Sequence, residues 1–113
     1  MDCLFCRIVR GEIPSTKVYE DDDLYAFRDI DPKAPTHILL VPKVHHSSVN
    51  ALDESSAAVV AKAYVVLKQL AEAEGIAQSG YRIVVNTGKD GGQSVDHLHF
   101  HLLGGRSLSW PPG

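Results

Sequence analysis

Apolar residues recur at helical spacing in two parts of the chain. Within residues 3–10 the apolar side chains lie three and four positions apart, and the run ends at Gly11, which predicts a short helix. A much longer helix is predicted from Asp53, a suitable N-cap, to Gly75, a suitable C′ residue. One stripe of this helix is expected to face a sheet and contains Val59, Ala63, Val66, Leu67 and Leu70.

Five short apolar runs indicate β-strands. They cover residues 18–20, 24–28, 37–41, 81–86 and 97–103. The first two flank the acidic segment 21–23, which predicts a hairpin whose carboxylates lie in a solvated turn. With one long helix between the third and fourth strands, the pattern predicts a single α+β domain over residues 1–113. Its sheet would be five-stranded and antiparallel, with one long and one short helix.

The long helix carries apolar side chains beyond its sheet-facing stripe, at Val60, Tyr64 and Val65. A helix this apolar needs cover on a second side, which predicts a subunit interface. A wider stripe facing the domain's own core explains the pattern equally well.

Composition and charge narrow the range of partners. The 113 residues are 44% hydrophobic and 22% charged, with a formal net charge of −3 at pH 7. A net acidic domain lacks the basic surface that binds long nucleic acids, so any phosphate recognition is expected to be local. The sequence has neither a basic leader before an apolar core nor an apolar run of membrane-spanning length. We therefore expect a cytoplasmic protein with no membrane partner.

Residues 97–103, His-Leu-His-Phe-His-Leu-Leu, hold three histidines two positions apart. In a strand His97, His99 and His101 would share one face, and the apolar residues between them would anchor the other. Imidazole transfers protons, attacks phosphorus and binds transition metals near neutral pH. Packing gives no reason for three imidazoles together, so this row is a candidate catalytic or metal site.

Both cysteines, Cys3 and Cys6, lie in one Cys-x-x-Cys unit. In an intracellular protein this spacing indicates metal or redox chemistry more often than a structural disulfide. A thioredoxin-like motif follows a strand, whereas two residues precede this one. Zinc, redox chemistry and an ordinary reduced pair remain open, and the histidines favour zinc.

A glycine-rich segment, residues 88–92, leads through Gln93 and Ser94 into the histidine run. Its backbone N–H groups would cradle an anion beside the imidazoles. A hairpin loop that needs positive φ explains the glycines equally well. Proximity to the histidines is what favours phosphate.

The histidine run resembles the His-φ-His-φ-His-φ-φ pattern of the histidine triad (HIT) superfamily, where φ is apolar. From end to end the chain is similar to the HINT branch of nucleotide-binding phosphoramidases. The similarity is carried by Cys3-Leu-Phe-Cys-Arg-Ile-Val, Ile13-Pro, Tyr19-Glu-Asp, Ala34-Pro-Thr-His37, Val41-Pro-Lys43, Tyr81-Arg, Val85-Asn86, Gly91-Gly-Gln-Ser94, Gly104-Gly-Arg and Trp110-Pro-Pro-Gly113. It implies the HIT-like α+β fold and a homodimer formed through the long helix and a sheet edge.

This resemblance also implies a mechanism. His99 would attack the α-phosphorus of a purine nucleoside 5′-phosphoramidate, and water would then release the nucleoside monophosphate from a nucleotidyl-histidine. His101 and Gln93 would contact phosphate oxygens, and Ser94 would act as a proton donor or relay for the leaving amine. His37 would support the site, or it is an ordinary buried strand histidine.

The implied nucleotide-binding residues lie mostly outside the histidine run. Asp29 would accept hydrogen bonds from the ribose hydroxyls, apolar side chains would hold the base, and Asn86 would help to position the phosphate end of the nucleotide. Together with the residues above, the set contains Phe5, Ile8, Phe27, Asp29, Ile30, Asn86, Gly92 and Trp110. The apolar members are equally typical of plain core, and Asp29 of a turn. Trp110 would reach the active site of a partner subunit, or anchor the chain end on the surface.

Family members that keep the cysteine pair resemble a Cys₂His₂ zinc site, which here would be Cys3, Cys6, His45 and His97. Four protein ligands leave no open position, so the zinc would be structural. The adjacent His46 makes the third ligand ambiguous, and register favours His45. Members without the cysteines exist, so activity would not require the metal. No organic cofactor is expected.

Other functions remain open at this point. His97, His99 and His101 would alternatively bind a catalytic metal that activates water. A nucleotide-binding scaffold dimer with little turnover would use the same residues. A dinucleoside polyphosphate hydrolase is disfavoured, by resemblance, because the chain is short and ends in Trp-Pro-Pro-Gly. Asp96 and Arg28 differ from residues frequent in the family, and either would alter the leaving-group preference.

Overall fold

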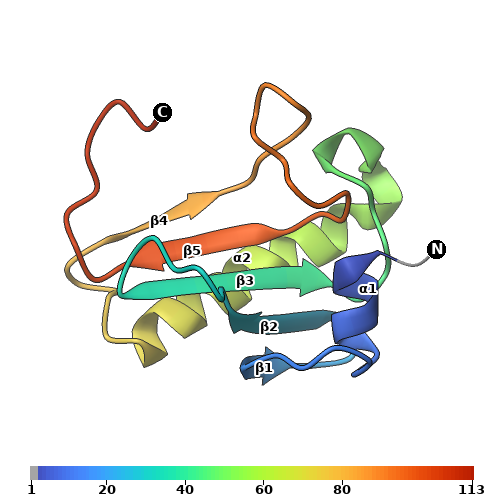
Figure 1. Cartoon of the computed structure of the whole chain (residues 1–113), viewed down its shortest axis with the longest axis horizontal. Coiled ribbons are helices and arrows are strands. Elements are labelled where there is room, and N and C mark those ends of the chain that lie inside the picture. Colours follow the sequence, from blue (N-terminus) through green and yellow to red (C-terminus); the bar gives the residue numbers. More distant parts are fainter. Residues whose placement is uncertain (1–2) are drawn as a thin grey trace.

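The strands form one antiparallel sheet, as predicted (Figure 1). They are β1 (Lys17–Glu20), β2 (Leu24–Arg28), β3 (Thr36–Pro42), β4 (Tyr81–Val84) and β5 (Phe100–Gly104). The computed structural model describes residues 3–113. The strand order is β1-β2-β3-β5-β4, so β3 pairs with a strand from the far end of the chain. This pairing brings the histidine run beside the residues that follow β2.

The long helical segment begins at Asp53 and ends before Gly75, as predicted. The Asp53 side chain caps its first turn in a capping box. Gly75 adopts a φ of +75°, and the N–H of Ile76 donates to the carbonyl of Ala71, which closes the helix with a Schellman motif. The segment consists of the 3₁₀ turn η2 (Glu54–Ser56) and the helix α2 (Ala57–Ala73), preceded by a second 3₁₀ turn, η1 (Val49–Ala51).

Apolar side chains are buried on both faces of the sheet. Helix α2 lies across one face (Figure 1), where Leu67 packs in a core with residues of β2, β3 and β5. The other face carries a smaller cluster closed by the short helix α1 (Leu4–Val9). That cluster contains Phe5, Ile8, Tyr25, Phe27, Leu39 and Val41. Burial on both faces explains why β3 is a continuous apolar run rather than an alternating one.

The histidine strand begins later than predicted. β5 starts at Phe100, so His97 and His99 precede the regular strand. The N–H of Leu98 donates to the carbonyl of His46 at 2.6 Å, which pairs this stretch with a loop instead of a strand. The predicted alternation still holds, because Leu98, Phe100 and Leu102 belong to the core under α2. The strand predicted over residues 81–86 likewise ends early, at Val84.

The second apolar side of α2 is partly covered. Val60 packs against the core and the Tyr64 ring contacts Phe100, yet Tyr64 is 46% exposed and Val65 54% exposed. A wide core-facing stripe therefore accounts for part of the pattern and leaves an exposed apolar patch.

Among the described residues, no helix is long and apolar enough to cross a membrane.

Candidate functional site

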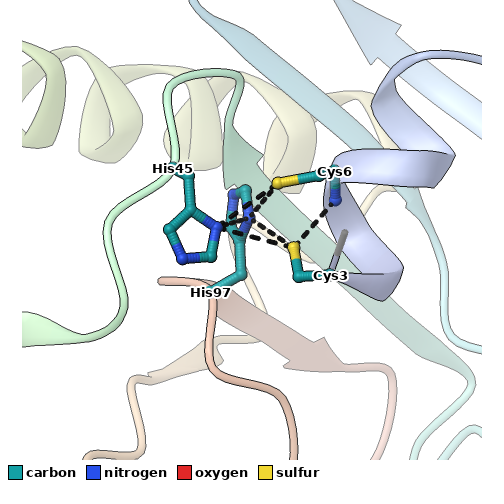
Figure 2. A group of neighbouring side chains, drawn as sticks. All are labelled: Cys3, Cys6, His45 and His97. Atoms are coloured by element: carbon teal, nitrogen blue, oxygen red, sulfur yellow. Dashed lines mark hydrogen bonds between the residues drawn. The ribbon is translucent and has the colours of Figure 1, made fainter. Parts of the chain in front are cut away.

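Two cysteines and two histidines from three segments converge at the N-terminal end of α1 (Figure 2). Nδ1 of His97 lies 3.2 Å from Sγ of Cys3 and 3.5 Å from Sγ of Cys6. Nδ1 of His45 lies 3.5 and 3.3 Å from the same two sulfur atoms, and the two Nδ1 atoms are 3.2 Å apart. The four ligand atoms all lie within 4.8 Å of one another. His46 is not part of this group and lines a separate surface pocket with Val44 and Val59.

The donor set and its dimensions fit a tetrahedral zinc ion. Zn–S bonds of about 2.3 Å and Zn–N bonds of about 2.0–2.1 Å require N–N and N–S separations of about 3.3–3.6 Å. The hydrogen-bond network also leaves Nδ1 of His97 available as a ligand atom. Nε2 of His97 lies 2.8 Å from the carbonyl of Pro42 and donates to it, so Nδ1 keeps its lone pair for a metal. Burial raises the pKa of the Cys6 thiol, and a bound cation would oppose that effect.

The backbone of His97 holds the ring of His99. Its Nδ1 lies 2.7 Å from the carbonyl of His97, and because a carbonyl accepts, Nδ1 carries the proton. With the proton on Nδ1, a neutral His99 ring would keep the lone pair of Nε2 free. The Phe5 ring packs edge-on against His99, with ring centroids 5.0 Å apart. The residue is buried, with 4% of its surface exposed.

A second hydrogen-bond chain determines the proton positions on His101. The backbone N–H of Lys33 donates to Nδ1 of His37 at 3.0 Å, so the proton of the neutral His37 ring lies on Nε2. Nε2 of His37 lies 2.9 Å from Nδ1 of His101 and donates to it. His101 must then carry its own proton on Nε2, where it is a donor. The carboxylate of Asp29 lies 3.4 Å from Nε2 of His37.

Burial keeps both of these histidines neutral. Burial lowers the pKa of His101 to about 4, with further lowering by the neighbouring His99 and His37. Burial also lowers the pKa of His37, and the charge of Asp29 only partly opposes it. Near pH 7 the pair therefore presents a neutral N–H donor instead of a positive charge.

Two further metal arrangements fit less well. Ligand atoms of Asp29, His37 and His101 lie within 4.8 Å of one another. A cation there would have to displace the proton on His37 Nε2, and Nδ1 cannot take that proton because it accepts from Lys33. The alternative trio of His97, His99 and His101 is not among the metal-compatible groups of the described residues, since the three rings turn to different partners.

Gln93 is fully engaged within the protein. Its Nε2 donates to the carbonyls of Ser47 at 2.7 Å and Val95 at 3.0 Å, and its Oε1 accepts from the N–H of Gly88 at 3.0 Å. The side chain thus ties the glycine-rich loop to the segment after His45. Sequence reasoning found the residue but not this contact, because the link to Ser47 spans 46 positions.

The remaining predicted residues lie in different surroundings. Phe5, Ile8 and Phe27 share the cluster beside the histidines, and Asp29 lies next to His37. Asn86 is half-buried after β4, while Gly92 and Ser94 are exposed on the loop before His97. Ile30 is 99% exposed and Trp110 is also exposed. The C-terminus lies at the opposite end of the molecule from α1 (Figure 1).

The fold and the site define a class: a small α+β domain in which one imidazole has its Nδ1 bound to a carbonyl, beside a second imidazole whose Nε2 carries the proton. The sequence model of the HIT domain matches residues 10–108, and the chain belongs to the HIT family.

Individual relatives agree with this assignment. The chain is 48% identical to the purine nucleoside phosphoramidase of Escherichia coli over 107 residues, covering 95% of this chain and 90% of that protein. It is also 48% identical to a 14 kDa zinc-binding protein of Zea mays over 112 residues, covering 97% and 87%. Among solved structures it is similar to a HIT family hydrolase from Legionella pneumophila, with 50% identity and a TM-score of 0.98. That match covers 99% of this chain and 100% of the other.

Proposed function

We propose that the protein hydrolyses the P–N bond of purine nucleoside 5′-phosphoramidates and releases a nucleoside monophosphate and an amine. The observation that carries this proposal is the 2.7 Å contact from Nδ1 of His99 to the carbonyl of His97, which keeps Nε2 free to attack. Covalent catalysis replaces one hard displacement by two easier ones. The similarity to a purine nucleoside phosphoramidase supports the choice of substrate.

The two displacements balance as follows. Nε2 of His99 bonds to the α-phosphorus, the P–N bond breaks, and its electron pair leaves with the amine. The amine takes up a proton that the hydroxyl of Ser94 relays from solvent. In the second step water attacks phosphorus and gives a proton to solvent, and the electron pair of the P–Nε2 bond returns to His99. One water is consumed for each monophosphate and amine formed.

Neighbouring groups stabilise the charge that develops. The carbonyl of His97 accepts from Nδ1 while the nucleotidyl ring is positively charged, and Nε2–H of His101 donates to a phosphate oxygen. The backbone N–H of Gly92 donates to the carbonyl of Lys89 at 3.0 Å, so a contact with the phosphate requires this hydrogen bond to be exchanged. Gln93 orders this loop, and a direct contact with phosphate requires it to exchange one of its carbonyl partners.

The nucleoside would lie alongside the histidines and the cluster under α1, whose Phe5 ring packs against His99. Phe5, Ile8 and Phe27 supply an apolar wall for the base. The exposed Ile30 covers the base from outside, and the burial of its side chain on binding would favour the complex. Asp29 accepts hydrogen bonds from the ribose hydroxyls, and Asn86 helps to orient the phosphate end of the nucleotide.

Two assembly features belong to the proposal. Structural zinc is held by Cys3, Cys6, His45 and His97, supported by the ligand spacing and by a zinc-binding relative.

A homodimer forms through α2 and the edge strand β4, where Trp110 of one copy reaches the other copy's site. Edge strand β1 has a register shift and contains Lys17, both of which discourage pairing, whereas β4 has no register shift. We place this dimer in the cytoplasm as one domain over residues 1–113.

Steady-state turnover of adenosine 5′-phosphoramidate tests the proposal. His99→Asn should reduce kcat at least a thousandfold, because the nucleophile is removed. His46→Asn is the matched control, since that side chain lines a different pocket, and it should retain activity. Folded His99→Asn with normal turnover would refute the proposal. Nucleotide binding without turnover by the wild type would support a scaffold instead, and preferred cleavage of dinucleoside polyphosphates would assign the other hydrolase activity.

A further inference from the structure

The cysteine and histidine cluster and the free imidazole of His99 share a residue. His97 offers Nδ1 to the cluster through its side chain, and its backbone carbonyl accepts the proton of His99 Nδ1. Any group that fixes the His97 ring therefore also fixes the acceptor that orients His99. We propose that a metal bound by Cys3, Cys6, His45 and His97 acts as a positioning device for His99, an inference that rests on the proposed function.

A second connection runs through helix α1. Phe5 lies between the two cysteines, and its ring packs edge-on against both His99 and His97, at centroid distances of 5.0 and 6.0 Å. Helix α1 has only six residues, which is too short to be stable by itself. Its N-cap is Cys3, whose sulfur also accepts from the N–H of Cys6 at 3.1 Å. A metal on both thiolates would hold this helix, and with it the Phe5 ring, against the nucleophile.

A third connection leads from His45 to the glycine-rich loop. The carbonyl of His46, the residue after His45, accepts from the N–H of Leu98. The carbonyl of the next residue, Ser47, accepts from Nε2 of Gln93. Gln93 in turn holds Gly88. Fixing the His45 ring would therefore restrict the backbone before His99 and the loop that carries Ser94. The cluster is thus linked to His99 in three ways: through the backbone of His97, through Phe5 of α1, and through the segment after His45.

The consequence is a selective effect on the chemical step. Zinc held by these four ligands would have no open position and would supply no catalytic water, so its effect would come from the residues that it fixes. Without it, His99 keeps its carbonyl acceptor but that acceptor and the Phe5 wall are free to shift. Misplacement of a reacting group by about 1 Å costs up to about a hundredfold in rate. Metal loss should thus lower kcat more than it changes KM, because Asp29 and Phe27 lie outside these links and stay in place.

The experiment compares the zinc-loaded full-length protein with the same protein after exhaustive chelation and with a Cys3→Ser, Cys6→Ser double variant. Leu4→Ser is the matched control, because Leu4 lies in the same helix with an exposed side chain. We expect kcat for adenosine 5′-phosphoramidate to fall about tenfold on chelation and in the double variant, with KM changed less than about twofold. Zinc should restore the chelated wild type, and the control should match the loaded protein.

The readout independent of turnover is the proton on Nδ1 of His99, observed by NMR in protein with ¹⁵N-labelled histidine. In the zinc form this proton should give a sharp, slowly exchanging signal, and on chelation the signal should broaden while circular dichroism shows an intact sheet. A sharp signal and full kcat in the folded, metal-free protein would overturn the positioning role. If the zinc-loaded wild type forms no nucleotidyl-histidine, the proposed function itself fails, whatever the NMR signal does.

Discussion

The two imidazoles that face the proposed phosphate have their protons placed by different means. His99 donates to a carbonyl two residues earlier, a contact within one short stretch of chain. His101 depends on His37, 64 positions away, which in turn depends on the backbone N–H of Lys33. The nucleophile is thus prepared locally, whereas the phosphate donor is prepared by the packing of β3 on β5.

Replacing His37 tests the assigned proton positions. In His37→Asn nothing forces the proton of His101 onto Nε2, so the phosphate donor is present only part of the time. We expect kcat to fall about tenfold to a hundredfold, with a smaller change in KM. Steady-state kinetics measure both, and thermal unfolding verifies that the variant is folded. An unchanged kcat in a folded variant would show that His37 is an ordinary buried histidine.

The lowered pKa of His101 predicts a dependence of stability on pH. The unfolded chain binds this proton with a pKa near 6.5, and the folded chain only near 4. Between these values the unfolded state holds more protons, so the free energy of unfolding decreases as the pH falls. The stabilisation is complete above about pH 6.5 and is lost toward pH 4.

Urea unfolding at pH 7 and pH 4.5 measures this effect, with a chelator present so that metal release does not contribute. We expect the wild type to lose about 1–2 kcal/mol more than His101→Asn between these pH values, an amount reduced for partial solvent screening. Equal losses would mean that His101 titrates normally in the folded protein.

At the level of elements, the acidic β1–β2 turn is more than a solvated loop. Oδ1 of Asp21 accepts from the N–H groups of Asp23 and Leu24, both at 2.8 Å, and Oδ2 accepts from the hydroxyl of Tyr19 at 2.6 Å. Partial burial raises the pKa of Asp21, but these hydrogen bonds and the contact with Lys62 outweigh it and hold the pKa well below its usual range. One carboxylate therefore organises the hairpin and ties it to α2.

Asp21→Ala should lower the free energy of unfolding by about 1–3 kcal/mol, because it leaves turn N–H groups without their acceptor. Asp22→Ala, one position along and exposed, should change it by less than about 0.5 kcal/mol. Chemical denaturation gives both values. If the two variants are equally stable, the turn depends on its backbone alone.

The elements were largely predictable, and their contacts only in part. Hydrophobic spacing located the two α-helices and five strands of residues 3–113, and the caps Asp53 and Gly75 could be read directly. The late start of β5 could not, because it depends on a bond between Leu98 and a loop 52 positions earlier. In the same way, Gln93 was a candidate phosphate ligand by resemblance, and its engagement with Ser47 depends on a distant loop.

At the scale of the whole molecule, the exposed patch on α2 and the free edge of β4 favour the proposed homodimer. Val65→Glu would place a charge in this patch and should convert the dimer to a monomer, measured by light scattering after size exclusion. Asp22→Lys, at the opposite edge of the sheet, is the control and should leave the mass unchanged. A wild type of monomer mass, or a dimeric Val65→Glu, would refute this interface.

The most direct test of the account is to identify the atom that carries the nucleotide. The zinc-loaded wild type is mixed with labelled adenosine 5′-phosphoramidate, quenched within a turnover, digested and examined by mass spectrometry. We predict a nucleotidyl group on His99, absent from the His99→Asn variant and present in His46→Asn. Turnover with no nucleotide on the protein, or with the group on His97 or His101, would contradict the assignment of His99 as the nucleophile.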